Sequence, residues 1–251
     1  AELLRITHLL KKTPDQLSGG EKQRVALARG LTKKTDLYVF DDPLSGLDFK
    51  LREQLIDDLQ RLQKSLGATF VYTTSDSLEA LMLAQQVYIL YGGKTVEAGA
   101  LEKVYSDPGH IKSMELLGFP SANVMEGTIS SRSGTLWCKT SLFQFPVDAG
   151  DQSKLREGQK VRVGIRPQKI QPFHNIKKGV SFTARIVLRE DLGGESVVHL
   201  EAEQTSLLSV LRQEDVHLLT KDEMDFRISP ASILIFSSED GQRIAQGGGD
   251  A

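Results

Sequence analysis

The sequence predicts an α/β domain followed by a small all-β domain. Up to about residue 119, segments with helical spacing alternate with short apolar runs, as in doubly wound α/β domains. From Phe119-Pro120 onward the long helical periods disappear, and short apolar runs separated by Gly, Asp, Ser and Pro take over. The chain has 251 residues, which is enough for two domains of ordinary size. We therefore expect an α/β domain over residues 1–119 and a β domain over 120–244.

The first clear elements of the α/β domain are a capped helix and a strand. Ser18 and Glu21 have the S-x-x-E spacing of a capping box, which predicts a helix of about three turns from Gly19 through Leu31. The apolar run 37–40 predicts a strand buried on both faces of a parallel sheet, ending in Asp41-Asp42-Pro43.

The rest of this domain repeats the alternation. A second helix is expected from about Phe49 to Leu66, because leucines recur at spacings of three and four and Gly67 follows to end it. The run "ATFVYTT", residues 68–74, predicts another buried strand, and Ser75-Asp76 open a short helix. A strand, a glycine turn and a strand follow over 86–99.

The β domain is predicted from several short runs with the spacing of a small barrel or sandwich. These runs are "TLWCKT", "KVRVGI", "FTARIVL", "SVVHLEAE" and "FRISPASILIF". The glycine-rich tail "AQGGGDA", residues 245–251, is expected to be disordered.

Composition excludes several classes of function. Lys and Arg total 31 against 33 for Asp and Glu, so the chain has no strong positive charge with which to bind nucleic acid. The single Cys138 cannot form an internal disulfide or a multi-cysteine metal site, and the scattered histidines show no ligand spacing. No apolar run approaches the ~20 residues that cross a bilayer, and no signal peptide is recognisable. We expect a cytoplasmic location.

The residues before the first helix suggest an anion site. Without Cβ atoms, Gly19 and Gly20 would let an anion approach the amides at the positive end of the helix, and Ser18 adds a hydroxyl donor. Asp41 ends a strand at the sheet edge where α/β domains bind ligands, so it could hold Mg²⁺, usually through water. Phosphate together with magnesium suggests a nucleotide.

These motifs resemble the ABC-type ATPases. The segment "LSGGEKQRVALARGL", Leu17 to Leu31, resembles their signature loop, and "LYVFDDPLSGLD", Leu37 to Asp48, resembles their Walker B strand and D-loop. The segment that follows resembles the one leading through their switch loop. "VRVGIRP" at 161–167 and "ILIFSSEDGQRI" resemble the TOBE-like, OB-like barrel of importer ATPases of the maltose and glycerol-phosphate type. The resemblance implies a partial P-loop NTPase domain followed by that barrel.

The resemblance also implies roles for individual residues. In the family two nucleotide-binding domains pair head to tail, and the signature loop of one caps the γ-phosphate of ATP held by the other. Asp41 would be a magnesium ligand, and Asp48 of the D-loop is either an interface residue or only the cap of the next helix. The cofactors implied are ATP and Mg²⁺, and the residues implied to contact nucleotide across the dimer are Leu17, Ser18, Gly19, Gly20, Glu21 and Asp48.

Departures from the family pattern are equally informative. No G-x-x-x-x-G-K-[ST] occurs in the 251 residues, and Gly93-Lys94-Thr95 lies in a predicted turn between strands rather than before a helix. Either the chain is a fragment or its own ATP site is lost. Asp42 stands where the family has the Glu that acts as general base, and Ser75 stands where it has the switch His.

These two substitutions predict weak or absent hydrolysis at the chain's own site. A positioned base is worth ~10²–10⁴ in rate and a transition-state donor ~10²–10³. Two alternatives remain open: Asp42 performs the task of the Glu with a shifted water, and Ser75 is a plain helix cap.

The function expected is that of an ATP-binding subunit of an ABC solute importer, with sugars as the expected cargo. Its partners would be a second nucleotide-binding subunit in a homo- or heterodimer, transmembrane permease subunits on the inner face of the membrane and, indirectly, an extracytoplasmic solute-binding protein. Within that function the chain would lend its signature loop to a partner's ATP. The alternative is a non-enzymatic regulatory or ligand-sensing subunit acting through its β domain; an ABC ATPase outside transport is disfavoured by the importer-like β domain.

Overall fold

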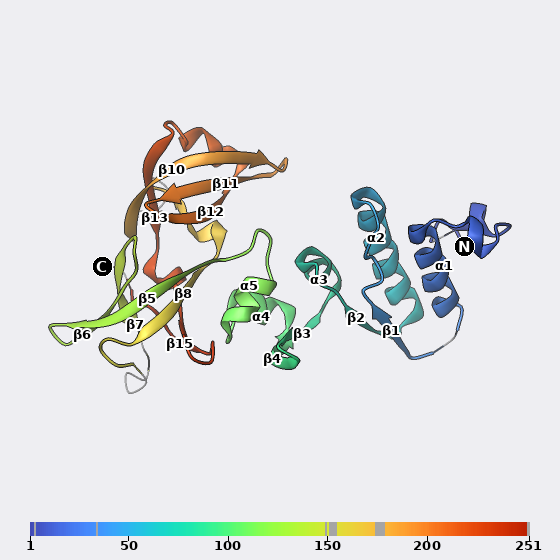
Figure 1. The fold of residues 1–251 in the computed structure, drawn as a ribbon, viewed down its shortest axis with the longest axis horizontal. Coiled ribbons are helices and arrows are strands. Elements are labelled where there is room, and N and C mark those ends of the chain that lie inside the picture. Colours follow the sequence, from blue (N-terminus) through green and yellow to red (C-terminus); the bar gives the residue numbers. More distant parts are fainter. Residues whose placement is uncertain (3, 34, 149, 151–154, 174–178, 250–251) are drawn as a thin grey trace. The chain divides into compact units, whose positions relative to one another are not determined.

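The computed structural model describes the chain except residues 3, 34, 149, 151–154, 174–178 and 250–251. It divides into two compact units, residues 1–84 and 85–251 (Figure 1). In the described part of the chain, no helix has the length and apolar character needed to span a membrane.

The N-terminal unit is a two-stranded parallel sheet with helices packed on it. Its elements are α1 (Gly19–Leu31), β1 (Leu37–Asp41), α2 (Phe49–Leu66), β2 (Thr69–Thr73) and α3 (Ser77–Leu83). β1 pairs with β2 from Leu37 opposite Thr69 to Asp41 opposite Thr73. These helices and strands have the order and the types that the sequence predicts.

The core of this unit lies on one face of the sheet. Tyr38 and Phe40 of β1 are buried with Leu27 of α1 and with Leu55 and Leu59 of α2. Phe70 of β2 lies edge-on to both rings, with centroid distances of 5.3 and 5.0 Å. The leucine spacing of α2 therefore marks a core-facing stripe, as expected.

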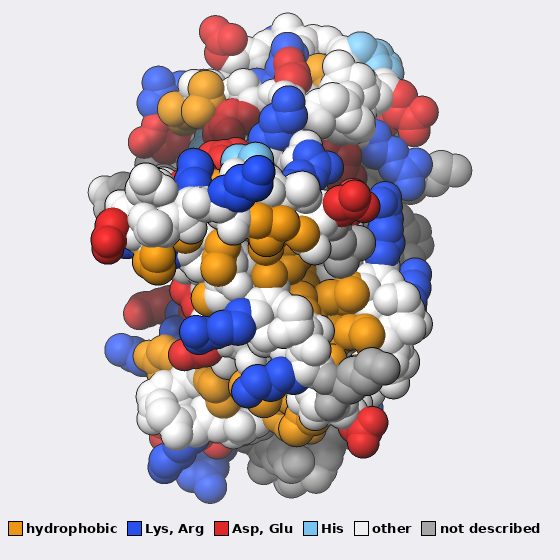
Figure 2. Space-filling model, turned by 90° about the vertical axis from the view of Figure 1, so that its right-hand side faces the viewer, with side chains coloured by type: hydrophobic (Ala, Val, Ile, Leu, Met, Phe, Trp, Pro, Cys, Tyr) orange, Lys and Arg blue, Asp and Glu red, His pale blue; other side chains and the backbone are white. Residues whose placement is uncertain are grey.

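The expectation that both strands are buried on both faces is wrong. Leu37 and Val39 of β1 are 51% and 67% exposed, and Val71 of β2 is 46% exposed. Side chains alternate between the faces of a strand, and only the face that carries Tyr38 and Phe40 is covered by α1 and α2 in the described residues. Figure 2 shows that hydrophobic side chains also gather between Lys and Arg side chains on one face of the molecule.

The C-terminal unit begins with a hairpin and two short helices. These are β3 (Gln86–Tyr91), β4 (Lys94–Ala100), α4 (Leu101–Ser106) and α5 (Ile111–Leu116). The compact unit thus starts at residue 85 rather than near 120, because α4 and α5 are bonded to the β domain. Arg166, just after β8 (Lys160–Ile165), donates to the carbonyl oxygens of Tyr105 and Leu117 at 3.0 and 2.6 Å.

The β domain combines a closed barrel with a five-stranded antiparallel sheet. Around the barrel the strand order is β14-β15-β7-β6-β5-β8, and in the sheet it is β12-β11-β10-β13-β9. The remaining strands are β5 (Asn123–Arg132), β6 (Thr135–Lys139), β7 (Gln144–Asp148), β9 (Gln171–Pro172), β10 (Val180–Asp191), β11 (Glu195–Ala202), β12 (Thr205–Arg212), β13 (Glu223–Ile228), β14 (Leu234–Ser237) and β15 (Arg243–Gly247).

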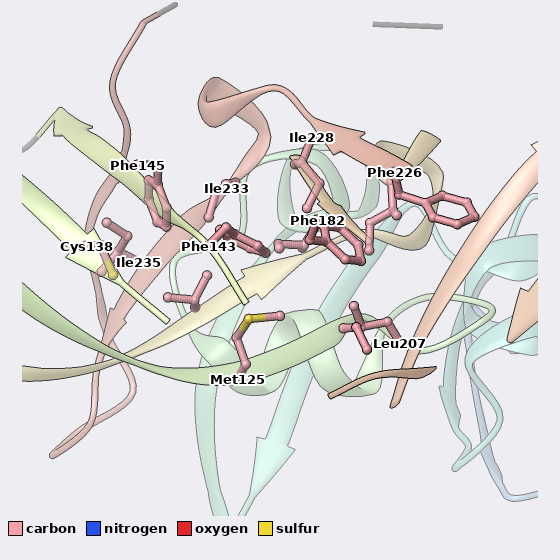
Figure 3. Packing of buried hydrophobic residues seen from close by; sticks show 14 of the residues in the cluster. Met125, Cys138, Phe143, Phe145, Phe182, Leu207, Phe226, Ile228, Ile233 and Ile235 are labelled. Carbon is pink, nitrogen blue, oxygen red and sulfur yellow. The ribbon is translucent and has the colours of Figure 1, made fainter. Parts of the chain in front are cut away.

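One hydrophobic cluster joins the barrel to the sheet. Figure 3 shows Phe143 from the barrel side next to Phe182 of the sheet, with Phe145 and Phe226 farther out on the two sides of this pair. The ring centroids of Phe143 and Phe182 are 5.9 Å apart. The predicted small β-barrel is confirmed, and the sheet shares its core.

The expected disorder of the tail is wrong for its first part. β15 continues through Gly247, where the backbone N–H donates to the carbonyl oxygen of Ile233 at 2.8 Å. A Cβ at Gly247 would lie 2.0 Å from the carbonyl oxygen of Pro230. Glycine is present here because two backbones approach closely; residues 250–251 lie outside the described residues.

Candidate functional site

The signature segment forms the start of α1 as the capping-box spacing predicts. The Ser18 hydroxyl accepts a hydrogen bond from the Glu21 amide at 3.3 Å, and the Glu21 carboxylate accepts one from the Ser18 amide at 2.8 Å. Leu17, just before the cap, packs against the core of the N-terminal unit. The amides of Gly19 and Gly20 belong to the first turn, which has no acceptors within the helix.

The two glycines of the signature differ in their surroundings. A Cβ at Gly20 would lie 3.0 Å from the side chain of Leu47, whereas a Cβ at Gly19 would meet no atom within 4 Å. Packing therefore explains why residue 20 is a glycine, because the buried Leu47 lies over it. Only at Gly19 does the missing side chain leave the helix N-terminus open, where a dipole and free amides favour an anion.

Glu21 carries a carboxylate held in its charged form. Besides the Ser18 amide it accepts a hydrogen bond from the Lys12 ammonium at 3.0 Å. The Ser18 bond first, and then Lys12, lower the pKa of Glu21 to about 2. Its negative charge near the N-terminus of α1 also complements the helix dipole.

A polar cavity of about 410 Å³ lies at the carboxyl end of β1 and β2. It brings together the end of the Walker B-like strand, the D-loop-like turn and the switch-like loop. Its lining residues are Asp42, Ser45, Gly46, Arg52, Ser75, Asp76, Ser77 and Glu79. Asp42 and Ser75, the two residues expected to act in hydrolysis, both line this cavity.

Asp42 occupies an unusual backbone conformation. Its φ is +44°, in the left-handed region that Asp adopts more readily than most residues. Its amide bonds to the carbonyl and hydroxyl oxygens of Thr73 on β2, at 3.1 and 3.0 Å. Its own carbonyl accepts from the side-chain amide of Gln23 on α1, at 3.2 Å. A direct link thus runs from the signature helix to the end of β1.

Asp41, the expected magnesium ligand, precedes Asp42 in the chain but is not one of the residues that line this cavity. Its carboxylate accepts a hydrogen bond from the Thr73 hydroxyl at 2.6 Å, which leaves the second oxygen available. No group of three or more His, Cys, Asp or Glu side chains that could hold a metal occurs among the described residues. Mg²⁺ usually keeps several waters and takes one or two protein carboxylates together with phosphate oxygens, a role that a single Asp41 fits.

The structure assigns the helix caps near the cavity. Asp48 caps α2, since its carboxylate accepts from the Leu51 amide at 3.0 Å. For α3 the cap is Asp76, which accepts from the Leu78 amide at 2.8 Å. Ser75 precedes that cap, so Ser75 is not the helix cap that one alternative expected. Asp48 has a structural role as a cap whether or not it also contacts a partner.

Glu79 and Arg52 are cavity residues that the sequence reasoning missed. The Glu79 side chain is 3% exposed and accepts hydrogen bonds from the hydroxyls of Tyr72 and Thr74, each at 2.7 Å. Burial first, and then the bond to Glu79, raise the pKa of Tyr72 well above its usual value. The signal in the sequence is the Asp76–Glu79 spacing, which suggests a capping box; Glu79 instead faces inward.

Gly93-Lys94-Thr95 is not a phosphate loop. Gly93 lies in the turn between β3 and β4, and the other two residues begin β4. A phosphate loop needs a helix N-terminus after its glycines, so the interpretation of this triplet as a chance match is confirmed.

Comparison with known proteins agrees with this geometry. A family model described as ABC transporter matches residues 1–45, and one described as TOBE domain matches 163–236. The first of these includes the signature segment and β1, and the second runs from β8 to β14.

Three curated relatives align along most of the chain. The sulfoquinovosyl glycerol transport ATP-binding protein of Agrobacterium fabrum is 31% identical over 238 residues, 95% of this chain and 65% of its own length. The xylose/arabinose import ATP-binding protein of Haloferax volcanii is 34% identical over 199 residues, 79% and 51% of the two chains. The sn-glycerol-3-phosphate import ATP-binding protein of Escherichia coli is 31% identical over 245 residues, 97% and 67%.

The chain spans about half to two thirds of the length of these relatives. Within that span the match includes the capped signature helix, the cavity at the end of β1 and the barrel. The chain therefore belongs to the family of ABC importer ATP-binding proteins, with an ABC transporter domain and a TOBE domain.

Proposed function

We propose that the chain acts in an ABC importer by offering its signature loop to ATP bound on a second nucleotide-binding subunit. The observation that carries this proposal is the open N-terminus of α1: Ser18 caps the helix, Gly19 leaves its first amides uncovered, and Glu21 fixes the cap. Such a terminus suits a γ-phosphate presented from outside the unit.

ATP and Mg²⁺ would be the cofactors of the assembled site. Ser18 and Gly19 at the tip of α1 would face the nucleotide on the other subunit, whereas Asp41 at the end of β1 would face a metal at the site of this chain itself. The bound nucleotide supplies the phosphoanhydride bond whose cleavage drives transport, and the metal neutralises its oxygens. The contribution of this chain is to donate hydrogen bonds and a helix dipole without reorganising, since the capping box already holds the loop.

Hydrolysis at the cavity of the chain itself is proposed to be weak. The Asp42 carboxylate is one methylene shorter than that of a Glu, and Ser75 lacks the reach and charge of an imidazole. Losing a positioned base and a transition-state donor costs ~10²–10⁴ and ~10²–10³ in rate, without simple additivity. The double variant Asp42→Glu with Ser75→His restores both groups, and the increase in its ATP hydrolysis rate would measure how much activity the two substitutions removed.

The partners proposed are a nucleotide-binding subunit with its own phosphate loop and a pair of membrane permease subunits. The printed names of the relatives concern sulfoquinovosyl glycerol, glycerol 3-phosphate and xylose or arabinose. From these we propose a sugar or a related small polar solute as the cargo, and a cytoplasmic place on the inner face of the membrane.

The experiment is to mix the purified chain with such a subunit and to measure ATP turnover. Ser18→Arg places a long cation where the phosphate would be capped and should lower turnover by at least ~10²-fold, the usual loss for one transition-state donor. Ser65→Arg, at an exposed position of α2, is the matched control and should leave turnover unchanged. Equal turnover with Ser18→Arg and Ser65→Arg would end the proposal.

A further inference from the structure

Arg52 lies between two loops that line the cavity, the turn before α2 and the switch-like loop after β2. It lies one turn into α2, where its amide donates to the carbonyl oxygen of Asp48 at 2.9 Å. Its guanidinium lines the cavity, and its side chain is 31% exposed. From this position the side chain can reach both the turn before α2 and the switch-like loop after β2.

The guanidinium contacts three separate pieces of the N-terminal unit. One terminal nitrogen donates to the Asp76 carboxylate at 2.8 Å, and the other donates to the carbonyl oxygen of Leu47 at 3.4 Å. Its Nε lies 3.8 Å from the Glu79 carboxylate, an ion pair without a hydrogen bond. A planar fork with donors in fixed directions can serve Asp76 and Leu47 together while its charge stays near Glu79, which a lysine ammonium cannot.

Both carboxylates are anchored on their far sides. Asp76 uses its other oxygen to accept from the Leu78 amide at 2.8 Å, so it caps α3 while it holds Arg52. The other oxygen of Glu79 accepts from Tyr72 and Thr74. Movement of Arg52 therefore pulls on the cap of α3 and on the end of β2 at once.

Burial makes these contacts expensive to release. Glu79 is 3% exposed at its side chain, and a buried carboxylate that loses its cation is left with an uncompensated charge. The alternative of swinging Arg52 into solvent is thus disfavoured, even though part of its surface faces water.

We propose that Arg52 is a positioning residue that couples the turn over residues 45–47 to the switch-like loop, so that the two walls of the cavity move as one piece. The functional importance of this inference rests on the proposed function: a partner that docks on the turn would, through Arg52, shift the switch-like loop and its Ser75. Its physical content is independent of nucleotide: Arg52 joins the turn directly to the cap of α3, in addition to the contact of Gln60 on α2 with the carbonyl oxygen of Met82.

The test is a double-mutant cycle read by amide hydrogen exchange in the whole chain. Gly46 has a φ of +72° and open space around its Cβ position, so Gly46→Ala strains the turn without a clash. With Arg52 present, this change should speed exchange of the Leu78 amide at least about twofold, the lower end of coupling between contacting residues. In an Arg52→Gln background the effect should be clearly smaller, and in Arg52→Lys it should be intermediate.

A matched control lies at the other end of α2. Gly67 has a φ of +61°, also with open space, so Gly67→Ala imposes the same kind of strain and should leave exchange at Leu78 unchanged. Equal effects of Gly46→Ala in the Arg52 and Arg52→Gln backgrounds, or an equal effect of Gly67→Ala, would overturn the proposal. Should Arg52→Gln fail to fold, the Arg52→Lys background decides in the same way. The measurement needs no ATP and no partner, so its outcome is separate from that of the Ser18→Arg experiment.

Discussion

At the scale of single residues, the signature loop shows how far a motif can be explained by chemistry alone. The capping box of Ser18 and Glu21 follows from sequence spacing and forms as predicted. In the sequence, nothing gives Gly20 a structural role that Gly19 lacks, but in the structure Gly20 lies under Leu47. No local pattern reveals that contact, because Leu47 belongs to a turn that reaches α1 only through the fold.

The charge on Glu21 leads to a pH prediction. Its pKa, lowered to about 2, means that its ionised form stabilises the folded chain at any pH above the unfolded value near 4.5, and that this contribution is lost as the pH falls towards 2. Glu21→Gln should therefore lower the thermal midpoint of unfolding at pH 7 and have a much smaller effect at pH 2.

A matched comparison uses another exposed glutamate. Glu53→Gln on α2 changes the same charge without touching a capping box and should leave the midpoint nearly unchanged at both pH values. A midpoint for Glu21→Gln that differs from that of the unsubstituted chain by the same amount at pH 2 and pH 7 would contradict the assignment of the cap.

At the scale of elements, periodicity predicts what local contacts decide and misses what distant contacts decide. α2 begins and ends as expected, because its cap, its leucine spacing and Gly67 are all local. β5 escapes prediction although its residues alternate between buried and exposed, because polar residues and a glycine interrupt the apolar pattern of "NVMEGTISSR". For β1 the apolar run predicts two buried faces, because such a run does not say how many layers cover it.

The attachment of α4 and α5 to the barrel is an element-scale feature that one side chain controls. Arg166 donates to the carbonyl oxygens of Tyr105, Met114 and Leu117, and its guanidinium lies 4.3 Å from the Tyr105 ring centroid. Burial lowers the pKa of Arg166, so these acceptors compensate for lost water. These contacts span many residues of sequence, which is why a change of pattern near residue 120 does not reveal that the compact unit starts at residue 85.

Arg166→Met should destabilise the C-terminal unit. Each carbonyl left buried without a donor costs ~1–3 kcal/mol, so the free energy of unfolding should fall by at least that amount. Urea titration followed by the fluorescence of Trp137, the single tryptophan and a residue of β6, measures it. Arg162→Met on β8 removes one partly exposed ion pair with Glu115 and should cost under ~1 kcal/mol. Equal losses for the two variants would show that Arg166 does not hold the helices.

At the scale of the whole molecule, the fold class and the family can be predicted from the amino-acid sequence, and the architecture of the cavity cannot. The motifs around Ser18, Asp42 and Ser75 are short and local, so the order of residues along the chain is enough to recognise them. That Glu79 and Arg52 complete the cavity depends on how α2 and α3 meet over the strand ends. Sequence spacing assigns Glu79 to a cap, and nothing in the spacing indicates which carboxylate Arg52 would hold.

The central claim concerns a helix N-terminus that serves a nucleotide on another subunit. Its most direct test is a structure of the chain assembled with a phosphate-loop-bearing subunit in the presence of ATP and Mg²⁺. The account predicts that the γ-phosphate held by the other subunit lies within hydrogen-bond distance, ~2.7–3.2 Å, of the Ser18 hydroxyl and the Gly19 amide. A nucleotide bound elsewhere, with the start of α1 facing solvent or packed against protein, would contradict it.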